Sequence, residues 1–271
     1  MDILETIIAT KREELAGATA KKRSLRQALA ASPSGIIAEF KRKSPSKGWI
    51  HADAEPEQVV PAYAAAGAAA LSVLTDESYF GGSLDFIRRV RPLVDIPILR
   101  KDFIIDPFQL AEAKLAGADA VLLIAACLTR EACAALTAEA HRLGLEVLLE
   151  IHSPEELDYI TPDVDVVGVN NRHLGTFVTD VQTSFDLAPL LSQRADRNYF
   201  SSHRAEKPIS APPSTTPSHA AGPVFVSESG ISDPATVRAL REAGFRGFLM
   251  GENFMKQPDP GAALGAFIQA L

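Results

Sequence analysis

Lysine and glutamate side chains follow short apolar runs at several widely separated places in the chain. Residues 37–48 read IAEFKRKSPSKG, and alternation along a strand gives Glu39 and Lys41 the same facing. Lys101 and Glu150 stand at the ends of two other apolar runs. Nearby cations or partial desolvation lower the pKa of a lysine that acts as a general acid, and apolar surroundings raise the pKa of a glutamate that shuttles a proton. Taken alone, residues 37–48 fit a solvated charged loop equally well.

Two glycine-containing dipeptides suggest an anion-binding site. Ser229-Gly230 and Gly251-Glu252 each follow an apolar run near the end of the chain. Glycine lets backbone N–H groups approach a phosphate closely, and the start of a helix adds its positive end. Because the Glu252 carboxylate would repel a phosphate, we expect its backbone N–H to bind while its side chain points away. Each glycine by itself fits an ordinary tight turn as well.

These side chains need a scaffold, and the chain predicts one from repeated units. Eight apolar, β-branched runs alternate with Ala-, Leu- and Glu-rich helical segments, and Gly67, Gly117, Gly144 and Gly244 separate a helix from the next strand. This repetition predicts a (β/α)8 TIM barrel. An open doubly wound sheet is the alternative, but no Gly-x-Gly-x-x-Gly follows any strand. The predicted strands are residues 36–40, 70–75, 96–100, 120–124, 146–150, 166–170, 224–228 and 247–250.

In such a barrel the carboxyl ends of the strands line one mouth, where active sites lie. Polar side chains follow most of the predicted strands, whereas the strands themselves are apolar. This shared position predicts an active site at the mouth rather than scattered surface charges. Phe80 and Phe103 either wall an aromatic substrate there or pack beneath the loops. The remaining candidates are Ser44, Asn170, Arg172 and Glu228.

Composition excludes several classes of function. The 271 residues carry a net charge of −7, which argues against general nucleic-acid binding. Two cysteines provide neither a disulfide framework nor a cysteine zinc site, and the six histidines never pair at ligand spacing, so we expect no metal. No signal peptide and no apolar run of membrane-spanning length is evident. We therefore expect a cytoplasmic protein without a membrane partner.

The chain is expected to form a single barrel domain over residues 1–271 with two additions. Residues 1–34 form an N-terminal helical extension, in which an apolar face is expected to lie across one end of the barrel. Residues 192–222, between helix 6 and strand 7, are rich in Pro and Ser and are expected to be a flexible insertion. Because the insertion follows a helix and precedes a strand, we expect it on the non-catalytic face of the barrel. It is then either a tolerated loop expansion or, alternatively, a partner-binding loop.

Several segments resemble indole-3-glycerol phosphate synthases of tryptophan biosynthesis. They include IAEFKRKSPSKG at 37–48, YFGG at 79–82, LRKDFI at 99–104, VNNR at 169–172 and VSESGI at 226–231. The resemblance implies conversion of 1-(2-carboxyphenylamino)-1-deoxyribulose 5-phosphate to indole-3-glycerol phosphate, carbon dioxide and water. It implies no metal or organic cofactor, and a phosphorylated small molecule as the partner. We expect a monomer or a weak homo-oligomer.

The resemblance also implies roles for individual residues. Lys101 resembles the general acid of ring closure, Lys41 the cation that holds the anthranilate carboxylate, and Glu150 the acid/base of dehydration. Glu39 and Asn170 resemble orienting groups. The implied supporting members are Ser44, Arg172 and Glu228; the implied phosphate cradle is Ser229, Gly230, Gly251 and Glu252; the implied anthranilate walls are Phe80 and Phe103. Trp49 and His51 receive no role.

Three alternatives compete with this interpretation. Phosphoribosylanthranilate isomerase is a related barrel, but its chemistry needs a cysteine near the end of strand 1, where this chain has Glu39 and Lys41. A Schiff-base aldolase would use Lys101 as its nucleophile. A non-catalytic barrel used as a scaffold is the third, and the complete set of lysines and glutamates speaks against it.

Overall fold

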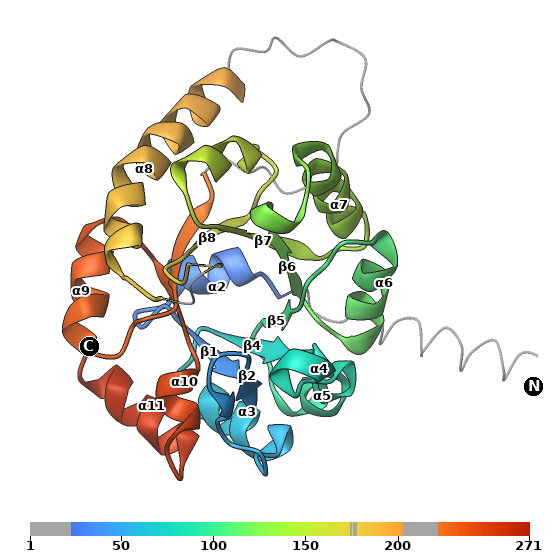
Figure 1. Cartoon of the computed structure of the whole chain (residues 1–271), viewed down its shortest axis with the longest axis vertical. Helices are drawn as coiled ribbons and strands as arrows, with labels where there is room; N and C mark the ends of the chain where they lie inside the picture. The colour runs from blue at the N-terminus through green and yellow to red at the C-terminus, as the bar shows by residue number, and fades with distance from the viewer. Residues whose placement is uncertain (1–22, 174, 176–177, 203–221) are drawn as a thin grey trace, which may run out of the picture.

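The structure is a computed structural model that describes residues 23–173, 175, 178–202 and 222–271. Eight parallel strands close into a barrel in the order β1-β10-β9-β8-β7-β6-β5-β4, with helices around it (Figure 1). The predicted (β/α)8 barrel is therefore confirmed. The barrel strands are β1 (Ile36–Phe40), β4 (Ala70–Leu74), β5 (Ile98–Lys101), β6 (Ala120–Ile124), β7 (Glu146–Ile151), β8 (Val166–Asn170), β9 (Val224–Glu228) and β10 (Gly247–Met250).

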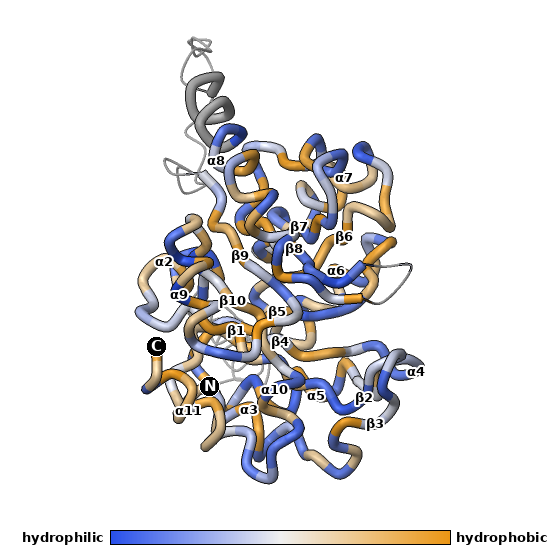
Figure 2. The backbone as a smooth tube through the Cα atoms, turned by 60° about the vertical axis from the view of Figure 1, so that its left-hand side comes forward, coloured by the Kyte–Doolittle hydropathy of each residue, from blue (hydrophilic) through white to orange (hydrophobic). Residues whose placement is uncertain are grey.

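Helices cover the outside of the barrel between successive strands. Hydrophobic and hydrophilic stretches alternate along helices such as α3 and α7, as expected for helices with one buried face (Figure 2). The segment between β7 and β8 is a 3₁₀ helix, η3, rather than an α-helix. The surrounding helices are α3 (Pro56–Ala65), α5 (Leu84–Val90), α6 (Pro107–Ala116), α7 (Arg130–Arg142), η3 (Pro154–Tyr159), α8 (Gln182–Ser202), α9 (Pro234–Glu242) and α11 (Pro260–Gln269).

Strand residues are buried on both faces, which explains their continuous apolar sequences. All five residues of β1 are buried. Ile36, Ala38 and Phe40 belong to the large core between the strands and the helices, whereas Ile37 belongs to a second cluster inside the barrel. The barrel interior is therefore a packed core below the mouth rather than a pore.

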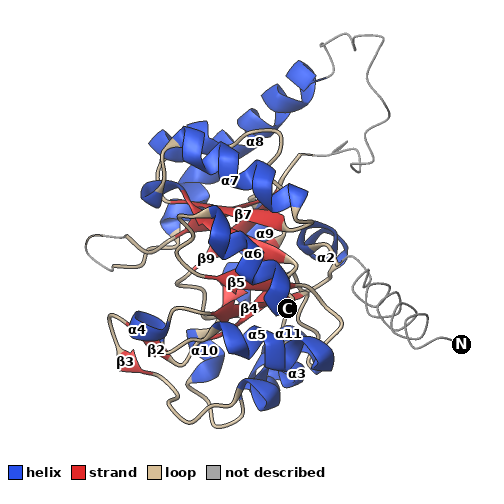
Figure 3. Cartoon of the chain, turned by 90° about the vertical axis from the view of Figure 1, so that its right-hand side faces the viewer, coloured by secondary structure: helices blue, strands red, loops and turns tan. Residues whose placement is uncertain are grey.

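Short additional elements decorate the two ends of the barrel. At one end lie β2 (Lys43–Ser44), β3 (Gly48–Trp49) and α4 (Glu77–Phe80), and α2 (Leu25–Ala31) lies at the opposite end (Figure 3). Smaller turns are η1 (Arg91–Leu93), η2 (Ala125–Cys127) and α10 (Glu252–Met255). Ser24 caps α2 by accepting a hydrogen bond from the Gln27 N–H, and Leu25 and Leu29 pack into the inner barrel cluster.

Two predicted additions fall largely outside the described residues. Residues 1–22 of the predicted N-terminal extension (1–34) lie outside the described residues. The described remainder of the extension contains α2. Helix α8 continues to Ser202, although the sequence predicted its end at Leu191 and a flexible segment from residue 192. The error arose because the Pro- and Ser-rich composition of residues 192–222 was taken to apply to the whole segment, although its first residues continue the helix. Residues 203–221 of the predicted insertion lie outside the described part of the chain.

Candidate active site

A cavity of about 820 Å³ opens at the carboxyl ends of the barrel strands. Residues from every barrel strand or from the loop after it line this cavity, as the sequence predicted for the mouth. Of the predicted site residues, Ser44 alone is absent from the lining. The predicted residues that line it are Glu39, Lys41, Phe80, Lys101, Phe103, Glu150, Asn170, Arg172, Glu228, Ser229, Gly230, Gly251 and Glu252.

Lys101 lies between two buried carboxyl groups on the cavity floor. Its Nζ is 2.7 Å from Glu150 Oε2 and 3.3 Å from Glu228 Oε2. Asn170 Nδ2 donates a hydrogen bond of 3.1 Å to the other Glu150 oxygen, Oε1. The Glu150 carboxylate is thereby fixed from two sides, by an ammonium ion and by an amide.

The charges of this cluster change the protonation of its members. Burial disfavours the Lys101 cation, but the Glu150, Glu228 and Glu39 carboxylates outweigh burial and raise the pKa of Lys101. Burial also opposes ionisation of Glu150, yet Lys101 and His152 lower the pKa of Glu150. Burial, with the neighbouring Glu150 and Glu39, raises the pKa of Glu228 to about 7. The lowered lysine pKa and raised Glu150 pKa expected from the sequence are therefore wrong, because carboxylates rather than cations surround Lys101.

Lys41 and Glu39 form a second pair at the end of β1. Lys41 Nζ lies 2.6 Å from Glu39 Oε1, and both side chains are at most 13% exposed. The shared facing predicted for these two residues is thus confirmed. A Cβ atom on Gly251 would lie 2.8 Å from Glu39 Oε1, so only glycine leaves room for this carboxylate.

The loops after β9 and β10, where the sequence predicts phosphate binding, line part of the cavity. Ser229 and Gly230 both have positive φ angles, 66° and 79°. A left-handed conformation is costly for serine, and such strain concentrates at functional sites. Asn171 Nδ2 donates to the Ser229 carbonyl at 3.0 Å and holds this turn in place.

Cations surround Glu252 at this end of the cavity. Lys47 and Lys256 both pair with Glu252 Oε1, and both lysines line the cavity. Burial opposes ionisation of Glu252, but the two lysines lower its pKa to about 2. The carboxylate that seemed to oppose an anion therefore brings two ammonium groups to the same place.

Aromatic and aliphatic side chains form another wall. The Phe80 and Phe103 rings lie 6.2 Å apart between centroids, and Leu122, Ile124 and Leu249 also line the cavity. Phe103 is 45% exposed, which is more than ordinary packing beneath a loop would leave. An apolar wall with a few polar groups is typical of small-molecule sites.

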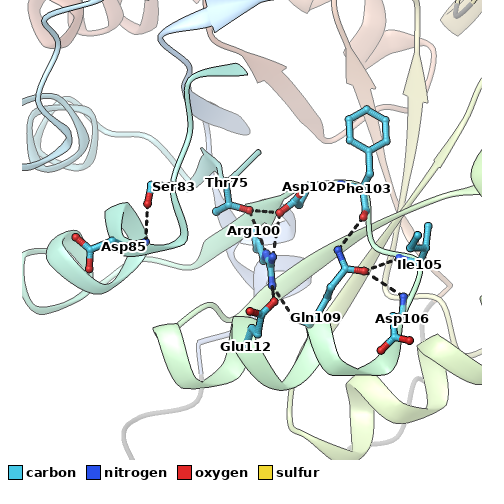
Figure 4. A network of polar contacts seen from close by, with 10 residues as sticks. All are labelled: Thr75, Ser83, Asp85, Arg100, Asp102, Phe103, Ile105, Asp106, Gln109 and Glu112. Atoms are coloured by element: carbon cyan, nitrogen blue, oxygen red, sulfur yellow. Dashed lines mark hydrogen bonds and ion pairs between the residues drawn. The ribbon is translucent and has the colours of Figure 1, made fainter. Parts of the chain in front are cut away.

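The loop that carries Phe103 is held by polar contacts to the start of α6 (Figure 4). Gln109 Nε2 donates to the Phe103 carbonyl at 2.9 Å, and Gln109 Oε1 accepts from the Ile105 and Asp106 N–H groups. Arg100 lies 2.9 Å from Asp102 and contacts the Gln109 carbonyl at 2.6 Å. These contacts fix the end of β5, and with it Lys101.

Other residues of the first motif hold loops together rather than line the cavity. Ser44 is buried in the β2–β3 hairpin, where it pairs with Gly48. Lys43 Nζ donates to the Ser78 carbonyl at 2.9 Å and lies 5.7 Å from the centroid of the Trp49 ring. His51 Nδ1 lies 3.1 Å from the Met255 carbonyl. Trp49 and His51 therefore have packing contacts next to the mouth.

The mouth is not positive overall. Nearly every basic side chain in the lining has an acidic neighbour, so positive charge is concentrated at particular points. Arg172 differs, because its buried Nε has no hydrogen-bond partner among the described residues. The basic lining residues are Lys41, Lys47, Lys101, Arg172 and Lys256; the acidic ones are Glu39, Asp76, Asp102, Glu150, Glu228 and Glu252.

Sequence reasoning missed four residues around the site. Lys47 lay within the recognised motif without a role, and Lys256 lies four residues after Glu252, a helical spacing that could have linked them. Cys127 lines the cavity after β6, and His152 lies directly behind Glu150. Across the described ranges, no three His, Cys, Asp or Glu side chains are grouped to hold a metal ion. Within them, no helix has the length and apolar character needed to cross a membrane.

Comparison with known proteins agrees with the geometry. The family described as "Indole-3-glycerol phosphate synthase" matches residues 4–202 and 214–267. The chain belongs to this family. A relative of that name from Bacteroides thetaiotaomicron is 54% identical over 100% of this chain and 99% of its own length. Relatives of the same name from Azoarcus sp. and Carboxydothermus hydrogenoformans are 40% and 44% identical, covering 98% and 89% of this chain and 98% and 83% of their own lengths.

A solved structure titled "Crystal Structure of 3-Hexulose-6-Phosphate Synthase" is similar in fold. It aligns with a TM-score of 0.57 over 87% of this chain and 98% of that chain, at 13% sequence identity. At this identity the likeness concerns the barrel alone. The chemistry must therefore be argued from the side chains of this member of the indole-3-glycerol phosphate synthase family.

Proposed function

We propose that the chain is an indole-3-glycerol phosphate synthase, a carboxy-lyase that acts on 1-(2-carboxyphenylamino)-1-deoxyribulose 5-phosphate. Its products are indole-3-glycerol phosphate, carbon dioxide and water. The observation that carries the proposal is the Lys101 ammonium, 2.7 Å from Glu150 and 3.3 Å from Glu228 on the cavity floor. An apolar wall lies on one side of this cluster and the glycine loops lie on another.

The parts of the cavity match the parts of this substrate. The phosphate would bind at Ser229, Gly230 and Gly251, with Lys47 and Lys256 nearby. The anthranilate ring would lie against Phe80 and Phe103. The volume of about 820 Å³ falls within the range of small-molecule sites.

Lys41 and Arg172 supply the remaining contacts to anionic or polar groups of the substrate. Lys41 would hold the anthranilate carboxylate and bring the carbon that carries it close to the sugar carbonyl. Because Lys41 is paired with Glu39, its ammonium is already oriented before the substrate arrives. Arg172 lines the same cavity and would contribute a hydrogen bond from its buried side chain.

Ring closure needs an acid at the carbonyl oxygen. As the ring carbon attacks the carbonyl carbon, negative charge develops on that oxygen, and Lys101 donates a proton to it. The raised pKa of Lys101, which the neighbouring carboxylates cause against the effect of burial, keeps the amine protonated at neutral pH. Loss of carbon dioxide then returns its bonding electrons to the ring and restores aromaticity.

Dehydration needs both an acid and a base. Glu150 accepts the proton that the ring system loses and then, as the acid, returns a proton to the new hydroxyl group, which leaves as water. The lowered pKa of Glu150, caused by Lys101 and His152 against burial, keeps this carboxylate ionised and ready to accept it. Glu228, with its pKa raised to about 7, lies close enough to Lys101 to exchange a proton with it between turnovers.

The decisive experiment mixes purified protein with the substrate and follows indole fluorescence. We expect Lys101→Met to lower kcat by about 10³-fold, the scale of a lost general acid. Lys114→Met is the matched control, because Lys114 is exposed on the outer helix α6. A wild-type protein without product, or a Lys101→Met variant with normal kcat, would contradict the proposal.

Two further assays of the purified protein distinguish the synthase from the competing aldolase and isomerase activities. A Schiff-base aldolase would trap its carbonyl substrate on Lys101 when borohydride is added, whereas the proposed ring closure leaves the chain mass unchanged. The isomerase alternative needs a cysteine at the end of β1, but Glu39 occupies that strand and Cys127 follows β6. Isomerisation of phosphoribosylanthranilate by the purified chain would favour the isomerase instead.

A further inference from the structure

His152 lies behind the catalytic cluster, outside the cavity lining, with its ring between two carboxylates. Its Nε2 is 3.3 Å from Glu150 Oε1, and its Nδ1 is 3.5 Å from Glu156 Oε2. The imidazole is 11% exposed, and neither ring nitrogen makes a hydrogen bond of good geometry in the described structure, so the two carboxylates act on the ring through their charge. A neutral imidazole carries one N–H and could face only one of these carboxylates as a donor, whereas an imidazolium has two N–H groups and a positive charge that attracts both.

Glu156 fixes His152 through the backbone as well as through the ring. Glu156 Oε2 accepts a hydrogen bond of 2.6 Å from the His152 N–H. Glu156 lies in the first turn of η3, directly after the loop that follows β7. The imidazole is therefore anchored at a set position behind Glu150.

The other ionisable groups near this ring are few. Lys101 binds the opposite oxygen of Glu150, and Glu228 lies beyond Lys101. On η2, Cys127 is near enough that burial, Glu150 and Glu156 raise the pKa of its thiol. Burial lowers the pKa of His152, but the Glu150 and Glu156 carboxylates outweigh it and raise that pKa to about 9. The ring is therefore charged at neutral pH.

We propose that His152 is a positioning residue that, as an imidazolium bridging Glu150 and Glu156, holds Glu150 in its orientation and in its ionised form. The inference deepens the proposed synthase activity and rests on it. Lys101 loses its charge when it protonates the substrate, and Glu150 would then lose its main cationic neighbour. His152 keeps its proton through this step, because it lies outside the cavity and does not contact the substrate.

The first test is independent of catalysis. In NMR titrations of the full-length, substrate-free protein, the imidazole signal that disappears in His152→Gln should titrate with a midpoint well above 7, near 9. Glu156→Gln should move this midpoint down by about one unit, since an adjacent opposite charge shifts a pKa by that order. A wild-type midpoint at or below about 6.5, the ordinary histidine value, would overturn the proposal.

The second test reads the effect on Glu150. In His152→Gln, the acidic limb of the kcat profile should move to higher pH by about one unit, while KM changes less than about twofold. His141→Gln is the control, because His141 pairs with Asp165, away from the cavity, and should leave the profile in place. An unshifted profile, or a uniform loss of kcat at every pH, would overturn a role in setting Glu150 ionisation. Wild-type inactivity would instead refute the synthase activity and leave the NMR result standing.

Discussion

A Cβ atom on Gly168 would lie 2.0 Å from Glu228 Oε1. Gly168 is on β8 and pairs in register with Val226 of the neighbouring strand β9, two residues before Glu228. The Glu228 carboxylate therefore occupies the space that any other residue at 168 would fill. Gly251 stands in the same relation to Glu39, so two glycines make room for two of the carboxylates around the lysines.

Gly168→Ala should displace Glu228 and disturb the contact with Lys101. Because the contact lies in the catalytic cluster, we expect kcat to fall at least tenfold, or about 1.4 kcal/mol in activation free energy. Steady-state kinetics and thermal unfolding should be measured together. Gly265→Ala on α11 is the control, because its Cβ would meet only the Ala66 methyl at 3.9 Å. Normal kcat in Gly168→Ala would show that the Glu228 position is unimportant.

Glu228 and Glu150 should affect stability in opposite directions. The folded-state pKa of Glu228, about 7, lies above the unfolded value of about 4.3, so its contribution to stability is complete below pH 4.3 and is lost as pH rises through 7. The pKa of Glu150 is depressed, so its contribution is present above about pH 4.3 and is lost as pH falls through the folded value.

Glu228→Gln should therefore be more stable than the wild type at pH 8, by on the order of 1–3 kcal/mol, and Glu150→Gln less stable. Urea unfolding at pH 5 and pH 8 measures both differences. The gain from Glu228→Gln should shrink at pH 5, where the wild-type carboxyl is already protonated. Equal destabilisation by both substitutions at pH 8 would refute the assigned protonation states.

Substitutions around Glu252 should change substrate affinity more than turnover. Lys256→Ala removes a cation next to the proposed phosphate site, so we expect KM to rise about tenfold with kcat nearly unchanged. Glu252→Gln should lower KM, because it leaves Lys47 and Lys256 without their shared carboxylate. Kinetics at low ionic strength compare the two. A rise in KM for both variants would show that Glu252 maintains the structure of the loop rather than neutralising Lys47 and Lys256.

Replacement of residues 203–221 by a short Gly/Ser linker should leave kcat within about twofold of wild type. The segment joins the end of α8 to the start of β9, and such connections lie at the end of the barrel opposite the active site. The variant should be assayed for indole formation beside the intact chain. A large fall in kcat with normal thermal stability would give the segment a functional role.

The barrel was predictable because its signals are local and repeated. Apolar runs such as 166–170 recur in every unit, left-handed glycines such as Gly117 precede several of the strands, and the structure has all eight strands. Helix α2 falls within the predicted N-terminal helical extension, and the Ser24 cap and the Leu25–Leu29 spacing mark it in the sequence. The end of α8 was placed too early, because the composition of residues 192–222 as a whole does not show that the helix continues to Ser202.

Much of the candidate site was also predictable, because strand ends converge in any barrel. Which side chains contact one another was not. Lys101 was expected among cations and lies among carboxylates, which reverses the direction of its pKa shift. His152 directly follows β7, so strand-end reasoning could have included it, but nothing in the sequence shows that it contacts Glu150 from outside the cavity lining. Ser44 was misplaced because the hairpin after β1 turns its side chain away from the cavity.

Helix α2 limits the routes by which the substrate can enter and the products can leave. Leu25 and Leu29 are fully buried against the inner strand residues at the end of the barrel away from the mouth. Within the described chain, the cavity is therefore open at the mouth and closed at the opposite end of the barrel. Carbon dioxide, water and the indole product would all leave through the mouth by which the substrate entered. Carbon dioxide is released before dehydration, so it must pass the indole ring while that ring is still bound.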